Sequence, residues 1–123
     1  MASDKQPLTV QVVGGAELEA ALRRLLAEVP QLANNLLDDA AMRVERDAKQ
    51  RCPVDTGRLR SSIQVASGQG WRTVSTNVEY GPHVEFGTRR RGAKPFLFPA
   101  AEAERPKFQA AVQAALAKLG GNA

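Results

Sequence analysis

The sequence contains a single cysteine, Cys52, and a single histidine, His83, among its 123 residues. One cysteine excludes an internal disulfide and a zinc site made of cysteines alone, and it is typical of a reducing compartment. No apolar run comes near the roughly 20 residues that cross a bilayer. The first ten residues also lack the basic and then apolar layout of a secretion signal. We therefore expect a soluble protein of the cell interior with no membrane partner.

The sequence also has few of the features that catalysis requires. Cys52 could act as a nucleophile beside His83, but the two lie far apart and neither has a family signature around it. Asp55, Glu79 and Glu85 could bind a divalent cation together with His83, yet their spacing fixes no metal geometry. Glycine loops of the Walker or dinucleotide type are missing. We predict that the chain is not an enzyme, with no catalytic residue, no cofactor and no metal.

The length and composition are those of one globular domain covering residues 1–123. A chain of this size buries roughly two-thirds of its unfolded surface, which is enough for one modest core. Hydrophobic residues make up 43% of the chain and charged residues 24%, which is too apolar for general disorder. The net charge of +4 favours an anionic partner, although many proteins that never touch nucleic acid carry a similar charge.

Apolar residues recur at three- and four-residue steps in three places, which predicts three helices. Pro30 separates the first helix from the second, and Pro53 disfavours helical geometry at Cys52, so the second helix should end near Arg51. Pro106 allows two interpretations of the third: either the helix bends there, or its amphipathic part begins there. The predicted helices cover residues 16–29, 33–51 and, in the amphipathic part, 108–119.

Alternating and β-branched residues predict strands. Residues 8–13 read as one strand, followed by a turn at Gly14 and Gly15. Residues 62–78 read as a hairpin with its turn at 68–70. Neither face of this hairpin is wholly apolar, so we expect it to be partly exposed or to face a neighbouring subunit. A tight turn and a short helical piece should follow in the stretch EYGPHVEFGT.

The stretch CPVDTGRLRSSI interrupts the helical pattern and reads as a structural hinge. Asp55 and Thr56 side chains can accept hydrogen bonds from amides two or three residues on, and so start a turn or a short helix. Gly57 permits a positive φ or a close approach of the backbone. Leu59 would anchor the short helix in the core. The hinge therefore joins the long helix to the hairpin and needs no chemistry.

Arg89, Arg90, Arg91 and Lys94 form the densest positive charge in the chain. Three adjacent arginines cannot all face one core, so we expect them to be mostly solvated. The loop could serve solubility alone, or it could contact a phosphate backbone or an acidic surface of a partner protein. Sequence-specific reading of nucleic acid is disfavoured, because no helix-turn-helix, zinc or RNA-binding fingerprint accompanies the run.

Three segments, in this order and at these separations, resemble the phage tail-component family of siphophages: CPVDTGRLRSSI, VEYGPHVEFGT and KPFLFPA. The resemblance covers most of the chain, from the long helix to near the C-terminus. Each motif alone is weak, while the ordered set is fairly specific. The residues that match the family pattern are Thr56, Gly57, Leu59, Ser62, Ile63, Tyr80, Glu85, Gly87, Thr88, Pro95, Phe96, Pro99 and Ala100.

The resemblance implies an α+β fold, with two to three helices packed on a small antiparallel sheet and an extended hairpin. It also implies a non-catalytic structural protein of the virion neck, similar to the Z-type minor tail protein of lambda and made in the host cytoplasm. Such tail-completion, or head–tail joining, proteins form a ring at the top of the tail tube. The ring lies between the head-closure (adaptor) ring and the tail terminator, and double-stranded DNA passes through its channel. A hexamer would match tail tubes and a dodecamer would match portals; the residues do not choose between them.

A ring subunit needs two different surfaces that meet head to tail. We expect the hairpin and the aromatic segment after it to supply them, with Glu85 as a polar anchor that is hydrogen-bonded or paired to an arginine. Alternatively, Glu85 merely caps a neighbouring turn. The basic loop would line the DNA channel or dock on an adjacent ring. A small intracellular nucleic-acid-binding protein that uses this loop remains the other possible function. The candidate subunit-interface residues are Tyr80, Glu85, Phe86, Thr88 and Phe96.

Overall fold

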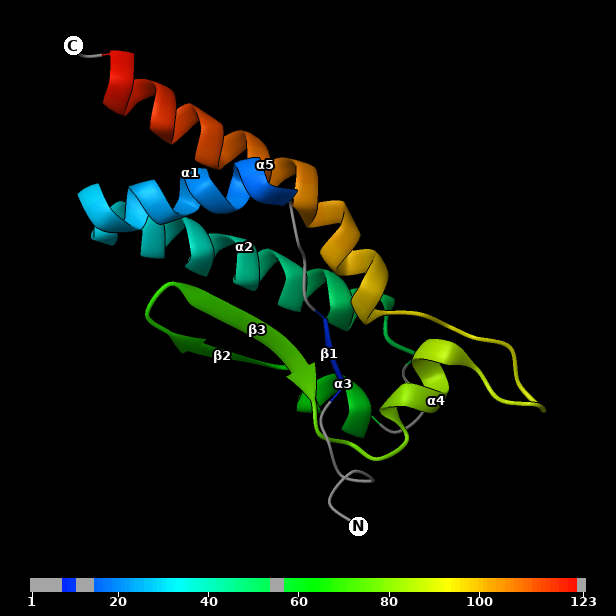
Figure 1. Cartoon of the computed structure of the whole chain (residues 1–123). Helices are drawn as coiled ribbons and strands as arrows, with labels where there is room; N and C mark the ends of the chain where they lie inside the picture. Colours follow the sequence, from blue (N-terminus) through cyan, green and yellow to red (C-terminus); the bar gives the residue numbers. More distant parts are fainter. Residues whose placement is uncertain (1–7, 11–14, 54–56, 122–123) are drawn as a thin grey trace.

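The computed structural model describes residues 8–10, 15–53 and 57–121 of the chain. Three long helices and a small sheet account for most of these residues, and two short helices lie beside the sheet (Figure 1). In chain order the elements are β1 (Leu8–Val10), α1 (Gly15–Glu28), α2 (Pro30–Arg51), α3 (Arg58–Ser62), β2 (Gln64–Gly68), β3 (Trp71–Thr76), α4 (Gly81–Phe86) and α5 (Leu97–Gly121).

The two prolines near α2 set its limits. Pro30 occupies the first helical position, where the missing N–H has no partner to lose. Pro53 restricts Cys52, whose backbone is extended, and the helix ends at Arg51 as predicted. The predicted apolar stripe is also confirmed, because the buried residues of α2 follow it at three- and four-residue steps. These residues are Ala33, Leu37, Ala41, Val44 and Ala48.

The sheet has three antiparallel strands in the order β1–β3–β2. The predicted hairpin is confirmed, with a two-residue turn between β2 and β3. The predicted first strand is confirmed at Leu8–Val10, and the rest of that prediction, residues 11–13, lies outside the described residues. The helix α2 contacts the sheet, while α1 and α5 pack against α2 and against each other.

The last helix follows the first of the two interpretations left open by the sequence. It begins at Leu97 and continues through Pro106. Proline in a helix interior removes one hydrogen bond, and its ring presses on the preceding turn, which bends a helix rather than ending it when the packing holds both halves. Figure 1 shows α5 changing direction along its length.

Two hydrophobic clusters form the core. The first joins the sheet, α3, the C-terminal half of α2 and the start of α5. The second joins α1, the N-terminal part of α2 and the C-terminal half of α5. The α+β class is thus confirmed. Among the described residues, no helix is long and apolar enough to cross a membrane.

Candidate functional site

The N-terminus of α5 is held by a carboxylate from another helix. The side chain of Glu85, on α4, is only 4% exposed. Its Oε1 accepts hydrogen bonds from the backbone N–H groups of Phe96 (3.0 Å) and Leu97 (2.9 Å), and its Oε2 accepts one from Phe98 (2.9 Å). Amides at the start of a helix have no carbonyl partner within it and favour negative charge. Glu85 therefore fixes α4 against α5.

Residues 87–95, which we call the arginine loop, connect α4 to α5 and form a turn held by hydrogen bonds. The N–H of Thr88 donates to the carbonyl of Arg91 (2.9 Å). The Thr88 hydroxyl oxygen accepts hydrogen bonds from the N–H groups of Arg90 (3.3 Å) and Arg91 (3.2 Å). On the return side, the N–H of Lys94 donates to the carbonyl of Val84 in α4 (2.8 Å). The N–H of Gly87 donates to the carbonyl of His83 (2.9 Å), so both ends of the loop are tied to α4.

Gly87 makes the close start of this loop possible. Its φ of 81° lies in the left-handed region, where a side chain would be strained. A Cβ at this position would also stand 2.8 Å from the backbone nitrogen of Ala93. The backbone of residues 91–93 thus passes too close to residue 87 for any side chain to fit there. We refer to α4, the arginine loop and the first turn of α5 together as the elbow.

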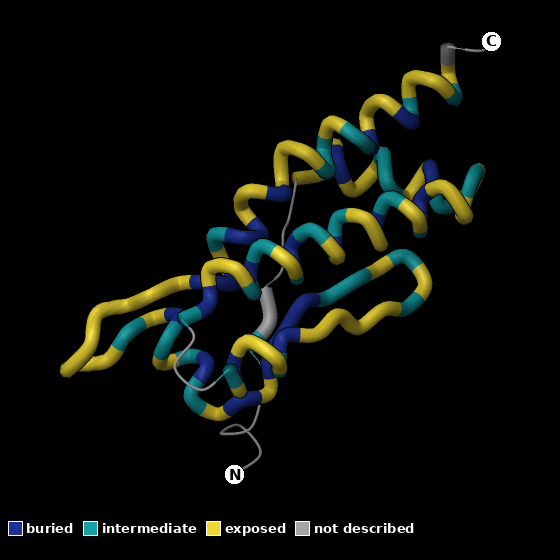
Figure 2. Tube along the Cα trace, turned by 180° about the vertical axis from the view of Figure 1, so that it is seen from behind, coloured by how far each residue is buried: buried dark blue, intermediate teal, exposed yellow. Residues whose placement is uncertain are grey.

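The elbow presents cations and aromatic rings to solvent. All four basic side chains of the loop are exposed, and the described residues include no carboxylate within ion-pair distance of them. Phe86 is 70% exposed and Phe98 is 47% exposed. Figure 2 shows the loop as an exposed projection from the body of the molecule. A basic surface with exposed aromatic rings is suited to contact with another macromolecule.

The predicted interface residues divide into two groups. Phe86 and Thr88 are exposed and Tyr80 is half-buried, so all three reach the surface. Phe96 is 0% exposed and belongs to the core of the subunit. Glu85 binds amides of its own chain rather than an arginine, which is the capping role that the sequence left as its alternative. We therefore drop Phe96 and Glu85 as interface candidates.

Sequence reasoning missed the exposed aromatic ring of Phe98. Phe96 and Phe98 are identical side chains two residues apart, and the sequence offers no signal that separates them. Phe96 precedes the first residue of α5 and turns inward, while Phe98 lies on the outer side of the first turn. The position of the helix start decides which ring is buried, and Glu85 holds that start in place.

The hinge connects the long helix to the sheet through hydroxyl groups. Gly57 has a φ of 77° directly before α3, which is one of the two possibilities that the sequence left open. Asp55 and Thr56 lie outside the described residues. The Ser62 hydroxyl donates to the carbonyl of Leu59 (2.6 Å) and is hydrogen-bonded to the hydroxyl of Thr76, at the end of β3. The hinge is thus attached to the sheet by bonds within the subunit.

The two residues considered as a catalytic pair lie in different environments, with Cys52 in the core and His83 at the surface. Cys52 is 3% exposed in the first cluster, and burial raises the pKa of its thiol. A raised pKa keeps the thiol protonated at neutral pH, which is the opposite of what a nucleophile needs. His83 is exposed on α4. In the described parts of the chain, no group of three or more histidine, cysteine, aspartate or glutamate residues is arranged to hold a metal.

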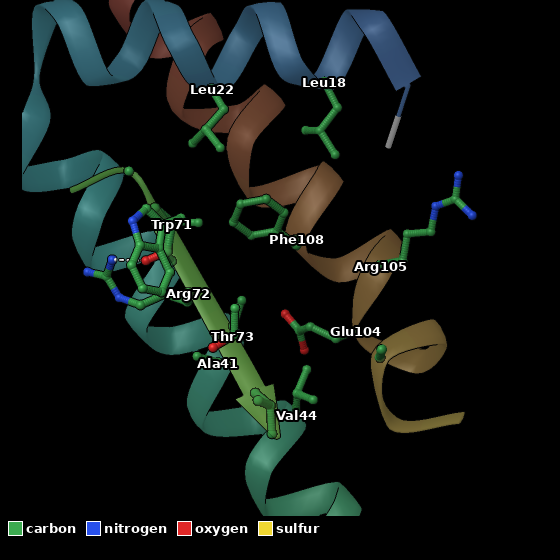
Figure 3. A pocket seen from close by; sticks show the side chains of 15 residues that line it. Leu18, Leu22, Ala41, Val44, Trp71, Arg72, Thr73, Glu104, Arg105 and Phe108 are labelled. Atoms are coloured by element: carbon green, nitrogen blue, oxygen red, sulfur yellow. Dashed lines mark hydrogen bonds between the residues drawn. The ribbon is translucent and has the colours of Figure 1, made fainter. Parts of the chain in front are cut away.

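A cavity of about 520 Å³ opens between α1, α2, β3 and α5 (Figure 3). Its walls are mainly apolar and include Leu18, Leu22 and Phe108. The buried carboxylate at its edge, Glu104, is neutralised by Arg43 through two hydrogen bonds of 2.8 and 2.7 Å. The hydrogen bond to Glu104 raises the pKa of Arg43, which keeps this guanidinium protonated. The buried carboxylate at the edge of the cavity is therefore already paired within the subunit.

Residues 16–87 match the family model described as "Bacteriophage HK97-gp10, putative tail-component". The matched segment runs from α1 to the end of α4 and stops at Gly87, the first residue of the arginine loop. No curated protein and no solved structure matches the chain. The model covers more than half of the sequence, and the chain therefore belongs to the HK97-gp10-like family of bacteriophage tail components.

Proposed function

We propose that this phage tail component is a tail-completion protein that joins head to tail. Copies of the chain form a ring at the top of the tail tube, between the head-closure ring and the tail terminator. Family membership makes the chain a structural protein of the phage tail. The proposal rests on one further observation: the arginine loop is bonded at both ends, exposed, and free of internal ion pairs in the described chain.

The composition of the elbow surface favours docking on an adjacent ring. A ring subunit needs contacts above and below it as well as to its neighbours. Exposed aromatic side chains such as Phe86 and Phe98 anchor protein interfaces, because a pocket on the partner can remove them from water. The four cations of the loop then select a partner surface that is acidic. The chemistry of this site is recognition and attachment rather than turnover of a substrate.

The same cations allow a weaker contact with the packaged genome where the loop borders the channel. DNA has to move past the ring, so such contact must be weak and blind to sequence. Arginine side chains that neutralise a few phosphates without reaching base edges have this character. The loop has no described helix or strand that would enter a groove. Its contribution to DNA would therefore be electrostatic alone.

Replacing Arg89, Arg90 and Arg91 with alanine tests the proposal. The side chains are solvated, so we expect the unfolding free energy to change by less than about 0.5 kcal/mol. We expect infectious particles to fall sharply, with unjoined heads and tails seen by electron microscopy. A control variant removes the same charge from exposed helix positions, at Arg23, Arg46 and Lys118. Normal yields of infectious particles from the loop variant would contradict the docking role.

A free nucleic-acid-binding protein is the competing function, and the exposed cations of the loop are the observation that favours it. It predicts a monomeric native mass and binding to duplex DNA that weakens steeply with salt. The ring predicts oligomers in solution and association of the wild-type chain with purified tails. Native mass and a salt titration, measured on the same preparation, distinguish the two functions.

A further inference from the structure

Strand β2 is an outer strand of the described sheet, and its side chains are largely exposed on both faces. It pairs with β3 on one side, and the described sheet has no strand on its other side. The side chains of residues 64–67 are all exposed. Because successive side chains of a strand point to opposite faces, exposure of four in a row means that both faces meet solvent. Figure 2 shows this strand as part of an exposed arm.

The register identifies the backbone groups that point away from the sheet. The turn between the strands has two residues, so Gly68 and Trp71 form its hydrogen-bonded closing pair. Hydrogen-bonded and non-bonded positions alternate along an antiparallel pair. Val65 and Ser67 therefore direct their N–H and C=O groups outward, at the edge of the sheet. These groups form a template that an added strand could complete.

This edge lacks the charges, the proline and the bulge that often keep sheet edges of monomeric proteins apart. Such edges usually carry charged residues or proline, or they are bulged or covered by a helix or loop. The sequence of β2 is QVASG, with no charge and no proline, and its register with β3 runs without a bulge. The indole of Trp71 lies so close to Gly68 that a Cβ there would overlap it. The one tryptophan of the chain thus sits beside the free edge.

We propose that the free edge of β2 pairs with the β1 edge of a second copy of this chain, so that the sheet continues from one subunit into the next. This inference rests on the proposed ring. In the described sheet, β1 also has a single strand neighbour, β3, so β1 and β2 are its two different edges. A head-to-tail ring needs two different surfaces of this kind. An uncharged edge also lets copies that each carry a net charge of +4 approach without facing cations.

The variant Ser67→Pro tests the pairing. Proline removes the outward N–H and places a ring at the edge, while the inward-facing bonds of β2 to β3 remain. We expect the circular dichroism spectrum of the monomer to be unchanged and the association to weaken by about tenfold or more. Native mass spectrometry of the full chain measures the association, and the fluorescence of Trp71 reports burial of the edge. The matched control, Ser67→Thr, keeps the N–H and should assemble like the wild type.

A second variant covers the case in which proline unfolds the hairpin. Val65→Lys leaves the backbone intact and places a charge on the edge, and it should also weaken assembly. Cysteines at Ser67 and Thr9 together should give a ladder of cross-linked multimers under mild oxidation, whereas Ser67→Cys alone should give none. Dimers from Ser67→Cys alone would mean that β2 pairs with itself, which overturns the inference.

The outcomes separate this inference from the proposed ring. If the wild type forms rings and both edge variants do so equally well, the strand pairing is overturned and the ring stands. If the wild type stays monomeric in solution and is missing from purified particles, the ring and the strand pairing fail together. Loss of rings in the edge variants alone, with intact circular dichroism, supports the pairing.

Discussion

The elbow and the hairpin differ in whether their polar groups have hydrogen-bond partners within the subunit. In the elbow, the carboxylate of Glu85 satisfies three amides of its own chain, and the arginine loop bonds back to Thr88 and α4. In the hairpin, the outer strand β2 has no second strand neighbour in the described sheet, and its side chains are exposed on both faces. The first region is completed by the subunit itself. Under the proposed pairing, the second is completed by a strand of a neighbouring copy. The comparison therefore separates backbone groups that stabilise the subunit from backbone groups that are available for association.

The largest effect is expected beside the elbow, at Phe96, which lies between the arginine loop and the first residue of α5. Phe96→Ala should lower the unfolding free energy by about 3–5 kcal/mol, because it leaves a cavity in the first cluster. Phe98→Ala, two residues further on, should cost less than about 1 kcal/mol because that ring is half-exposed. Urea unfolding followed by circular dichroism measures both. Equal losses from the two variants would show that the helix start does not separate an inner from an outer ring.

A smaller loss is expected from the carboxylate that holds α5. Glu85→Ala leaves three amides at the start of α5 without an acceptor, and we expect a cost of about 3 kcal/mol. Glu85→Gln keeps one acceptor oxygen and should cost roughly half as much. The control is Glu102→Gln, at an exposed position of α5, which should leave stability unchanged. Equal denaturant midpoints for Glu85→Ala and Glu102→Gln would show that the hydrogen bonds of Glu85 do not stabilise the elbow.

The smallest effect is expected in the hairpin. Gly68→Ala forces the Trp71 indole aside, but this ring is half-exposed and can rotate away, so the unfolding free energy should fall by less than about 1 kcal/mol. The emission maximum of the single tryptophan should shift as the ring leaves its position over the glycine. Gly120→Ala is the control, because a Cβ there meets nothing. An unchanged emission spectrum in Gly68→Ala would argue against the packing of the ring on the strand.

Much of this comparison could be predicted from the sequence, because it depends on local patterns. Three- and four-residue spacing located the long helices, Pro53 located the end of α2, and the short turn located the hairpin. The sequence also allowed a positive φ at Gly57, because glycine has no side chain to oppose it, and the structure has a positive φ there. The class of the fold could therefore be inferred before any tertiary contact was known.

The role of Glu85 could not be predicted in the same way. Its partners lie eleven and more residues further along the chain, beyond a loop of undetermined path. A buried carboxylate among apolar residues predicts a bonded partner but does not name one. The same long-range geometry decides that Phe96 is buried and Phe98 exposed. It also decides that α5 continues through Pro106, since packing on both sides outweighs the helix-breaking tendency of proline.

Helix α5 joins the two hydrophobic clusters and bends between them. Ala100 belongs to the first cluster and Val112 to the second, and Pro106 lies between them. The helices α2 and α5 thus contribute residues to both clusters, and a proline inside a helix allows α5 to bend between them. Loosening the packing of one cluster would therefore displace helices that also form the other cluster. We therefore expect the two clusters to unfold together, although a residue that ordinarily breaks helices lies inside the helix that joins them.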